Sequence, residues 1–497
     1  MLKKILIANR GEIAIRVASA CRQMGITAVG VYSEPDRTAK HIQYMDEAYL
    51  LGPASPLESY LNIDKIIEIA KNADCDAIHP GYGFLAENSD FAERCEREGL
   101  IFIGPRAETI RLLGSKIESR KLVKNAGAPI IPGMELSSNN FEEYRKAAEE
   151  IGYPVLIKAS AGGGGKGMRI VEREEDLADA LESASREAKS AFGDGTVYIE
   201  KLLKKPRHVE IQILADSTGR TVYLFERECS IQRRHQKIVE ETPSTALYPE
   251  LRRKMGEAAV KIAKAAGYLN AGTVEFLLDE DKSFYFLEVN TRIQVEHPIT
   301  EMVTGIDLVA HQIKIASGEE IPFEQKDLHQ RGSAIECRIY AEDPENNFFP
   351  SSGKILLCSE PTGPGIRCDS GIYSGYEVTV HYDPILSKLI AYGENRRQAL
   401  ERMSLALKDY VVLGIKNNIR FLYDVINHPE FHEGNTDTGF IPRNFPEYQI
   451  PQNDNDKLKY ALAAAVYHSE KKSPAVGVYG KSEAPTPWET LGAFRLF

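Results

Sequence analysis

The sequence predicts a multidomain protein of mixed α/β and α+β class. The chain has 497 residues, which is more than one hydrophobic core usually organises, so several domains are expected. Its opening residues alternate an apolar strand, an amphipathic helix and a second apolar strand. The character of the sequence then changes near Lys116 and again near Arg331. These observations divide the chain into three domains and a C-terminal extension.

The N-terminal domain, predicted over 1–113, has the pattern of a doubly wound, Rossmann-like α/β unit. A helix over 12–24 lies between its first two strands. This order is a βαβ unit and implies a parallel sheet. The first turn, at 9–12, lacks the G-x-G-x-x-G pattern, which counts against an NAD site. The four predicted strands are 4–8, 27–32, 75–79 and 100–103.

The central domain, predicted over 114–330, opens with a basic amphipathic helix over 115–125. Strands and helices are expected to alternate from there to about residue 330. The predicted strands are 155–158, 168–171 and 197–201, and the predicted helices are 141–151 and 174–190.

Four consecutive glycines, at 162–165, stand between two of these strands. The pattern is not a P-loop, because Lys166 is followed by Gly167 instead of Ser or Thr. A glycine run between strands predicts a mobile lid whose backbone N–H groups close over phosphates. Lys158, at the end of the preceding strand, adds a cation. The alternative interpretation is a merely flexible loop.

The C-terminal domain, predicted over 331–446, is strand-rich first and helical later, at 397–410 and 419–426. It is therefore expected to be a mixed β/α domain. The extension over 447–497 contains a helix-like stretch, a polar linker and an apolar end that includes Trp488. This end either docks a partner subunit or packs back on its own domain.

Composition narrows the class of protein. The net charge of −11 argues against a surface that coats nucleic acid. No apolar run approaches the ~20 residues of a membrane span, so no membrane association is expected. The first residues lack the long apolar run of a signal peptide, which favours a cytoplasmic location. The seven cysteines are odd in number and include no C-x-x-C pair, so they indicate neither a disulfide framework nor a zinc site.

The most informative segment is FYFLEVNTRIQVEHPITE, residues 284–301. Alternate side chains of an extended backbone share one face, so its polar residues are expected to form one row along a strand. Such a row can hold a divalent cation at one end and a small oxyanion at the other. The alternative is a solvated strand face. The row consists of Glu288, Asn290, Arg292, Gln294 and Glu296.

A second apolar strand, at 271–279, precedes this segment across a short polar turn at 280–283. Two strands joined in this way are typical of a hairpin. Pairing would bring Glu275 of the first strand beside Glu288 of the second. Carboxylate oxygens with open positions for water and phosphate are how Mg²⁺ is usually held. The pair therefore predicts a magnesium site.

Two further polar segments are ambiguous when taken alone. In 197–214, backbone groups near Lys201 are placed to contact an adenine edge, and His208 and Glu210 share a strand face. The alternative there is an exposed strand with a basic turn. The segment 226–244 concentrates amide and basic side chains that suit a small anion. Its alternative is a solvated charged loop.

Six long motifs in order resemble the biotin carboxylase subunits of biotin-dependent carboxylases, within the ATP-grasp superfamily. The resemblance covers nearly all of 1–446. It implies a central ATP-grasp domain with a glycine-rich lid over about 131–203. The motifs are KILIANRGEIAIRV, HPGYGFLAEN, KASAGGGGKGMR, RECSIQRRHQKIVEE, FLEVNTRIQVEHPITE and RGSAIECRIYAEDP.

The resemblance implies a role for each site residue. Glu296 is expected to act as general base, and Arg338 to face the ureido oxygen of biotin. The residues implied to hold Mg²⁺ (or Mn²⁺) are Glu275, Glu288 and Asn290. Those implied to hold bicarbonate are Lys237, Arg292, Gln294 and the backbone of Val295. Those implied to bind ATP are Lys116, Lys158, Gly164, Gly165, Glu200, Lys201, Leu203, His208, Gln232 and His235.

The implied reaction is the ATP-dependent carboxylation of biotin by bicarbonate, through carboxyphosphate. No Met-Lys-Met triplet occurs here, so the biotin is expected on a separate biotin carboxyl carrier protein. A separate carboxyltransferase subunit is the second expected partner, and the family commonly forms homodimers. The nearest alternative is another ATP-grasp ligase that makes an acyl-phosphate from a different carboxylate. A non-catalytic ATP-binding scaffold is disfavoured, because no predicted catalytic position is substituted.

Overall fold

The computed structural model describes residues 2–134, 140–159, 168–192, 195–450 and 463. The chain divides into two units, Met1–Tyr448 and Gln449–Phe497. The predicted extension over 447–497, with its apolar end, lies almost wholly outside the described residues. No described helix combines the length and the apolar character needed to cross a bilayer.

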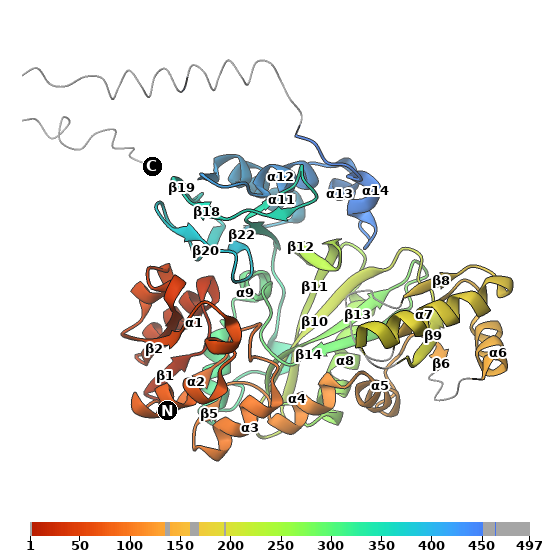
Figure 1. Cartoon of the computed structure of the whole chain (residues 1–497), viewed down its shortest axis with the longest axis horizontal. Helices are drawn as coiled ribbons and strands as arrows, with labels where there is room; N and C mark the ends of the chain where they lie inside the picture. Colours follow the sequence, from red (N-terminus) through yellow and green to blue (C-terminus); the bar gives the residue numbers. More distant parts are fainter. Residues whose placement is uncertain (1, 135–139, 160–167, 193–194, 451–462, 464–497) are drawn as a thin grey trace, which may run out of the picture. The chain divides into compact units, whose positions relative to one another are not determined.

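The N-terminal segment folds around a five-stranded parallel sheet of order β3-β2-β1-β4-β5 (Figure 1). The expected βαβ opening is confirmed. The sequence prediction missed β3, an edge strand in which only Leu51 is buried, so the apolar signal of a central strand is absent. The strands are β1 (Lys4–Ile7), β2 (Thr27–Ser33), β3 (Glu47–Gly52), β4 (Ala77–His79) and β5 (Ile101–Phe102). The helices are α1 (Gly11–Gln23), α2 (Ile63–Asn72), α3 (Ser89–Arg97) and α4 (Ala107–Gly114).

A four-stranded antiparallel sheet of order β6-β9-β7-β8 follows, with α6 and α7 packed on it (Figure 1). Its apolar core includes Val155, Ile157 and Ile199. The glycine run joins β7 to β8 and lies outside the described residues. The strands are β6 (Gly133–Met134), β7 (Val155–Ala159), β8 (Arg169–Val171) and β9 (Val197–Lys201). The helices are α5 (Lys116–Asn125), α6 (Phe141–Ile151) and α7 (Leu177–Phe192).

An eight-stranded antiparallel sheet of order β14-β13-β10-β11-β12-β15-β22-β20 is the largest sheet among the described residues. The expected alternation of strands and helices up to residue 330 is wrong here. Three strands, β10 (Arg207–Ala215), β11 (Thr221–Arg233) and β12 (Gln236–Thr242), follow one another without a helix. The turns between them are too short for a parallel crossover, so the strands pair antiparallel.

The same sheet continues into the C-terminal segment, where β12 pairs with β15. The strands within 207–290 and those within 333–393 therefore belong to one continuous sheet. The helices expected at 397–410 and 419–426 are confirmed. The remaining strands of this sheet are β13 (Asn270–Leu278), β14 (Phe284–Asn290), β15 (Ser333–Tyr340), β20 (Ile366–Ser370) and β22 (Ile385–Gly393). The helices are α8 (Pro249–Ala265), α9 (His297–Thr304), α10 (Leu308–Ala316), α11 (Arg396–Asp409), α12 (Ile419–Ile426), α13 (Pro429–Glu433) and α14 (Phe440–Asn444).

Candidate functional site

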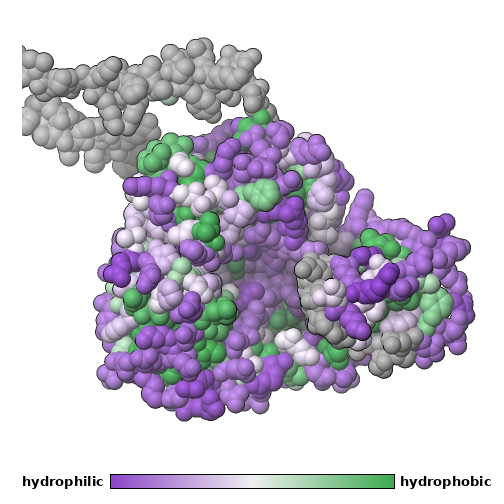
Figure 2. All heavy atoms as spheres, viewed as in Figure 1, coloured by the Kyte–Doolittle hydropathy of each residue, from purple (hydrophilic) through white to green (hydrophobic). Residues whose placement is uncertain are grey.

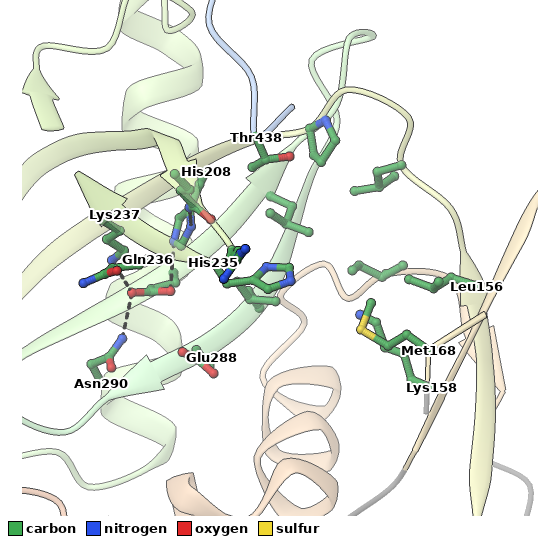
Figure 3. A pocket seen from close by; sticks show the side chains of 18 of the residues that line it. Leu156, Lys158, Met168, His208, His235, Gln236, Lys237, Glu288, Asn290 and Thr438 are labelled. Carbon is green, nitrogen blue, oxygen red and sulfur yellow. Dashed lines mark hydrogen bonds and ion pairs between the residues drawn. The ribbon is translucent and has the colours of Figure 1, made fainter. Parts of the chain in front are cut away.

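A cavity of about 690 Å³ lies between the four-stranded sheet and the eight-stranded sheet. Leu156 and Lys158 of β7, together with Met168 just before β8, face His235 and Glu288 across it (Figure 3). The surface of the molecule is hollowed beside the segment that carries the four-stranded sheet, and the hollow is mostly hydrophilic (Figure 2). Charged side chains and apolar ones both line this cavity, and a cavity of this size and lining suits a charged ligand with an apolar part.

The cavity gathers nearly every residue that the sequence singled out. Lys116 lines an adjoining cavity of about 590 Å³, which shares Lys158, Glu288 and other residues with the first. Gly164 and Gly165 lie outside the described residues. The predicted residues in the larger cavity are Lys158, Glu200, Lys201, Leu203, His208, Gln232, His235, Lys237, Glu275, Glu288, Asn290, Arg292, Gln294, Val295, Glu296 and Arg338.

The expected hairpin between β13 and β14 is confirmed. The two strands are antiparallel, and Glu275 lies directly opposite Glu288. Residues opposite each other in such a pair have closely spaced side chains. Glu275 is buried, whereas Glu288 is exposed and lines the cavity. The two carboxylates therefore meet at the floor of the cavity, as the sequence predicted.

The predicted polar row is not a continuous strand, because β14 ends at Asn290. Glu87 contacts the chain directly after the strand: its carboxylate accepts from the backbone N–H of Thr291 (3.0 Å) and from Arg292 Nε (2.8 Å). The chain then turns through 291–296 before α9 begins. The alternation expected to place five side chains on one strand face therefore applies only as far as Asn290.

The side chains beyond the strand still converge on the cavity, because the loop folds back over the sheet. Gln294 Nε2 donates to Glu275 Oε1 at 2.8 Å. Arg292 Nη2 donates to Asn290 Oδ1 at 2.9 Å. Glu296 is buried at the start of α9. Loop geometry, rather than strand alternation, assembles this part of the site.

Lys237 lies at the centre of three carboxylates. Its Nζ is 2.6 Å from Glu210 Oε2, 2.7 Å from Glu275 Oε1 and 2.8 Å from Glu296 Oε1. Burial by itself lowers the pKa of Lys237, but the three carboxylates reverse the effect and hold that pKa well above its ordinary value. The group is therefore a permanent ammonium at neutral pH.

Arg338, on β15, bridges two carboxylates. Its Nε donates to Glu240 Oε1 at 2.5 Å and its Nη2 donates to Glu296 Oε2 at 3.0 Å. Burial raises the pKa of Glu296, but Lys237 and Arg338 outweigh it, so the pKa falls below its ordinary value. Burial dominates at Glu240 and raises its pKa to about 7. Glu296 is therefore the permanent anion of the two.

Cys229 is a buried thiol beside these charged side chains, with its Sγ 3.9 Å from Glu296 Oε1. Burial holds the pKa of the thiol well above its ordinary value, and nearby carboxylates add to the shift. A thiol that stays protonated is a poor nucleophile. The geometry therefore gives no support to cysteine chemistry.

A divalent cation fits at the Glu275–Glu288 pair. Burial and then the charge of Glu275 raise the pKa of Glu288, so the two carboxylates repel each other in the absence of a cation. The amide of Asn290 lies beside them, with its Nδ2 2.8 Å from Glu275 Oε1. The two carboxylates supply oxygen ligands of the kind that Mg²⁺ prefers. The amide oxygen of Asn290, which accepts from Arg292 in this structure, is the third candidate ligand.

The other end of the cavity mixes cations with apolar side chains. Lys158 forms an ion pair with the buried Glu200. Gln232 Nε2 lies 2.6 Å from His208 Nδ1, and His208 Nε2 lies 2.8 Å from Glu275 Oε2. Leu203 and Pro442 contribute apolar surface. This end suits a flat heterocycle with polar edges, while the lysines suit its phosphates.

Sequence reasoning missed three residues that hold the site together. Arg227 is fully buried and its guanidinium donates to Glu210, at 2.5 Å, and to four other side chains. Glu240 pairs with Arg338, and Glu87 fixes the start of the loop. Arg227 and Glu240 lie in the ambiguous segment 226–244, whose strands are largely buried. The sequence did contain one indication of these residues: an ionisable side chain within an otherwise apolar strand is usually paired with another buried group.

Three family models match consecutive parts of the chain: the biotin carboxylase N-terminal domain at 1–110, the ATP-binding domain of the carbamoyl-phosphate synthase L chain at 115–324, and the biotin carboxylase C-terminal domain at 336–443. A pyruvate carboxylase subunit of Methanothermobacter thermautotrophicus is 54% identical over 441 residues, which are 89% of this chain and 90% of that protein. Biotin carboxylase 1 of Bacillus subtilis is 52% identical over 442 residues, 89% of this chain and 98% of that protein. The alpha subunit of methylcrotonoyl-CoA carboxylase from Dictyostelium discoideum is 50% identical over 496 residues, 100% of this chain and 70% of that protein.

Solved structures of biotin carboxylases also match this chain. A biotin carboxylase from Campylobacter jejuni, in a nucleotide complex, has a TM-score of 0.84 at 46% identity and covers 89% of this chain and 99% of that one. The biotin carboxylase domain dimer of 2-oxoglutarate carboxylase from Hydrogenobacter thermophilus, with MgADP and bicarbonate, has a TM-score of 0.85 at 46% identity and covers 91% of this chain and 100% of that one. The family models and relatives of this kind establish that the chain belongs to the biotin carboxylase family.

Proposed function

We propose that this chain uses ATP and bicarbonate to carboxylate biotin on a separate carrier protein. The observation that carries the proposal is the arrangement around Glu296. Lys237 and Arg338 hold that carboxylate at one end of a cavity whose floor is the Glu275–Glu288 pair. A site for an anion thus lies next to a site for a nucleotide-bound cation. The proposed domains are 1–113, 114–330 and 331–446.

The nucleotide is proposed to occupy the end of the cavity next to the four-stranded sheet. Mg²⁺ (or Mn²⁺) held by Glu275, Glu288 and Asn290 would supply positive charge against the phosphates. The residues proposed to contact ATP are Lys116, Lys158, Gly164, Gly165, Glu200, Lys201, Leu203, His208, Gln232 and His235. Closure of the lid would exclude water from a labile intermediate.

Bicarbonate is proposed to bind at Lys237, Arg292, Gln294 and the backbone of Val295. A guanidinium fork and an ammonium suit a planar oxyanion. The incoming anion would compete for the charge of Lys237, which otherwise stabilises the Glu296 carboxylate. Losing part of that stabilisation raises the pKa of Glu296 and makes it a better base. Glu296 then takes the proton of bicarbonate as its oxygen attacks the γ-phosphorus, forming carboxyphosphate and releasing ADP.

Biotin is proposed to meet Arg338. Carboxyphosphate breaks into CO₂ and phosphate, and the phosphate takes the proton from N1 of biotin. The resulting enolate carries its charge on the ureido oxygen, where the guanidinium of Arg338 would stabilise it. The nitrogen then adds to CO₂. Arg338 is already held in place by Glu240 and Glu296, which favours a fixed rather than a mobile cation.

The partners proposed from the family are a biotin carboxyl carrier protein and a carboxyltransferase, with a homodimer of this chain. Relatives are components of larger carboxylases, such as the subunits of pyruvate carboxylase and methylcrotonoyl-CoA carboxylase. The cytoplasmic location remains a prediction from the sequence.

The test is ATP hydrolysis with free biotin and MgATP, with and without bicarbonate. Turnover is expected to require bicarbonate and to rise with biotin. Glu288→Lys is expected to abolish turnover while leaving the fold intact, because it places a cation where the metal would bind. The alternative, an ATP-grasp ligase for another carboxylate, predicts turnover with that carboxylate and indifference to both biotin and bicarbonate.

A further inference from the structure

Lys388, on β22, is a fully buried lysine that the reaction described above does not use. Its relative exposure is 0%. Its Nζ lies 3.0 Å from the backbone carbonyl oxygen of Val295, to which it donates a hydrogen bond. Lys388 also lies directly opposite Arg338 in the β15–β22 pair. Two neighbouring cations of one sheet thus hold successive parts of the loop: Lys388 holds the carbonyl of Val295, and Arg338 holds the carboxylate of Glu296.

The carbonyl on the other side of Val295 is held as well. His297 Nδ1 lies 2.8 Å from the carbonyl oxygen of Gln294. In a trans peptide the C=O of one residue and the N–H of the next point in opposite directions. Fixing the Gln294 carbonyl therefore fixes the direction of the Val295 N–H, and fixing the Val295 carbonyl fixes the peptide that leads to Glu296. The two contacts together hold the stretch of loop that lines the cavity.

The charge of Lys388 is balanced from two other segments of the chain. Its Nζ is 3.0 Å from Glu12 Oε2, at the start of α1, and 3.8 Å from Asp369 Oδ2, on β20. Tyr82 donates from its hydroxyl to the second oxygen of Glu12. Stability alone does not account for this arrangement, since replacing buried ion pairs by apolar side chains is often neutral or stabilising.

We infer that Lys388 is a positioning residue for bicarbonate binding, which it serves by orienting the backbone of 294–296. This inference rests on the proposed function. Lys388 touches neither the nucleotide end of the cavity nor, among its contacts in the described chain, any side chain proposed to hold bicarbonate. Its loss should therefore weaken the binding of bicarbonate far more than the binding of ATP.

The experiment compares four forms of the full chain: the parent, Lys388→Met, Glu12→Gln, and the double variant Lys388→Met/Glu12→Gln. Methionine keeps the length and the apolar stem of lysine without its donor. The double variant removes both charges, so it tests the hydrogen bond to Val295 without leaving Glu12 unpaired. The readouts are the apparent KM for bicarbonate and for ATP in biotin-stimulated ATP hydrolysis, together with the thermal midpoint of each form.

The expected result is a rise of about 10-fold or more in the KM for bicarbonate in both forms that lack Lys388. The KM for ATP is expected to stay within about twofold, as an interaction made only with bicarbonate requires. Glu12→Gln alone, which keeps the donor, should leave the KM for bicarbonate near that of the parent. The double variant should recover the thermal midpoint lost in Lys388→Met without recovering bicarbonate affinity.

Three results would overturn the inference. Recovery of bicarbonate affinity in the double variant would mean that Lys388 only neutralises Glu12. Equal changes in both KM values would mean a general disturbance of the cavity. Failure of both Lys388 variants to fold would mean that Lys388 is required for folding and does not act by orienting the loop. A parent enzyme without bicarbonate-dependent turnover would refute the proposed function itself, which is a separate outcome.

Discussion

At the scale of single residues, the site consists of buried cations already occupied by carboxylates. Lys237 contacts three of them and Arg338 contacts two. An anionic substrate that approaches Lys237 or Arg338 must compete with these internal partners. Removing one partner leaves the other charge buried and unpaired, which costs far more than the net strength of the pair. Substitutions here should therefore keep either the shape or the charge of the side chain.

Glu296→Gln keeps the shape of the side chain and removes the proposed base. Bicarbonate-dependent turnover should fall by roughly 10²-fold or more. ATP binding should persist, because the side-chain contacts of Glu296 are with Lys237, Arg338 and Cys229, none of which is proposed to bind ATP. Steady-state kinetics and calorimetry with MgATP measure the two quantities. Turnover close to that of the parent would show that another group takes the proton.

Arg338→Lys keeps the charge but loses the fork that spans Glu240 and Glu296. Carboxylation of biotin should fall more than bicarbonate-dependent ATP cleavage, because the enolate needs a fixed donor. The two rates are measured on the same preparation, as carboxybiotin formed and phosphate released. Equal losses in both rates would contradict the role assigned to Arg338.

Glu240→Gln tests the protonation of a buried carboxyl. Burial raises its pKa from the ordinary 4.5 to about 7. Between these values the folded protein keeps a proton that the unfolded chain releases, so the parent loses stability as the pH rises through this window. The glutamine variant lacks this loss. Its urea midpoint relative to the parent should therefore rise from pH 5 to pH 8, and a flat difference would contradict the shift.

At the scale of secondary structure, three adjacent strands and one helix are tied together by one guanidinium. Arg227 of β11 contacts Glu210 of β10, Thr273 of β13 and Thr300 of α9. It also donates to Gln294 in the loop, at 3.3 Å. β13, which carries the proposed metal ligand Glu275, and the loop that leads to the proposed base are thereby held in one relative position.

Arg227→Met should destabilise the protein by about 3–5 kcal/mol, because it leaves Glu210 buried beside fewer cations. The exposed Arg253, which pairs with Glu257 four residues away on α8, provides the matched control. Arg253→Met should leave the urea midpoint close to that of the parent, because an exposed ion pair contributes little to stability. Urea denaturation measures both variants, and similar midpoints for the two would contradict the structural role of Arg227.

At the scale of the whole molecule, one sheet joins the central and C-terminal segments, and the site draws on all three segments. Glu87 comes from the N-terminal segment, Glu275 and Glu288 from the central one, and Arg338 from the C-terminal one. The cavity therefore exists only when the segments are folded together. Activity of an isolated segment is not expected.

Deletion of 449–497 should leave biotin-stimulated ATP hydrolysis within about twofold of the parent. The cavity is lined by residues within the unit Met1–Tyr448, and the Bacillus subtilis relative matches over 98% of its own length while covering 89% of this chain. Association with a carboxyltransferase partner should weaken, as gel filtration of the mixed subunits would show. Unchanged association would refute the docking role of the apolar end.

Local sequence patterns were enough to predict the parallel N-terminal sheet, the β13–β14 hairpin and the meeting of Glu275 with Glu288. Each follows from apolar alternation and short polar turns, which depend on neighbouring residues. The same patterns predicted that the polar side chains of 288–296 would face one site.

How those side chains arrive there depends on contacts between remote parts of the chain. Directly after the strand ends at Asn290, the backbone of Thr291 donates to Glu87, which lies about 200 residues earlier in the chain. The roles of Arg227, Glu240 and Lys388 likewise depend on partners from distant strands, and a buried charge is recognisable only once its partner is known. Local periodicity predicts which face of a strand or helix a residue lies on. Which residues pack against that face is determined by contacts between segments that are remote in the sequence.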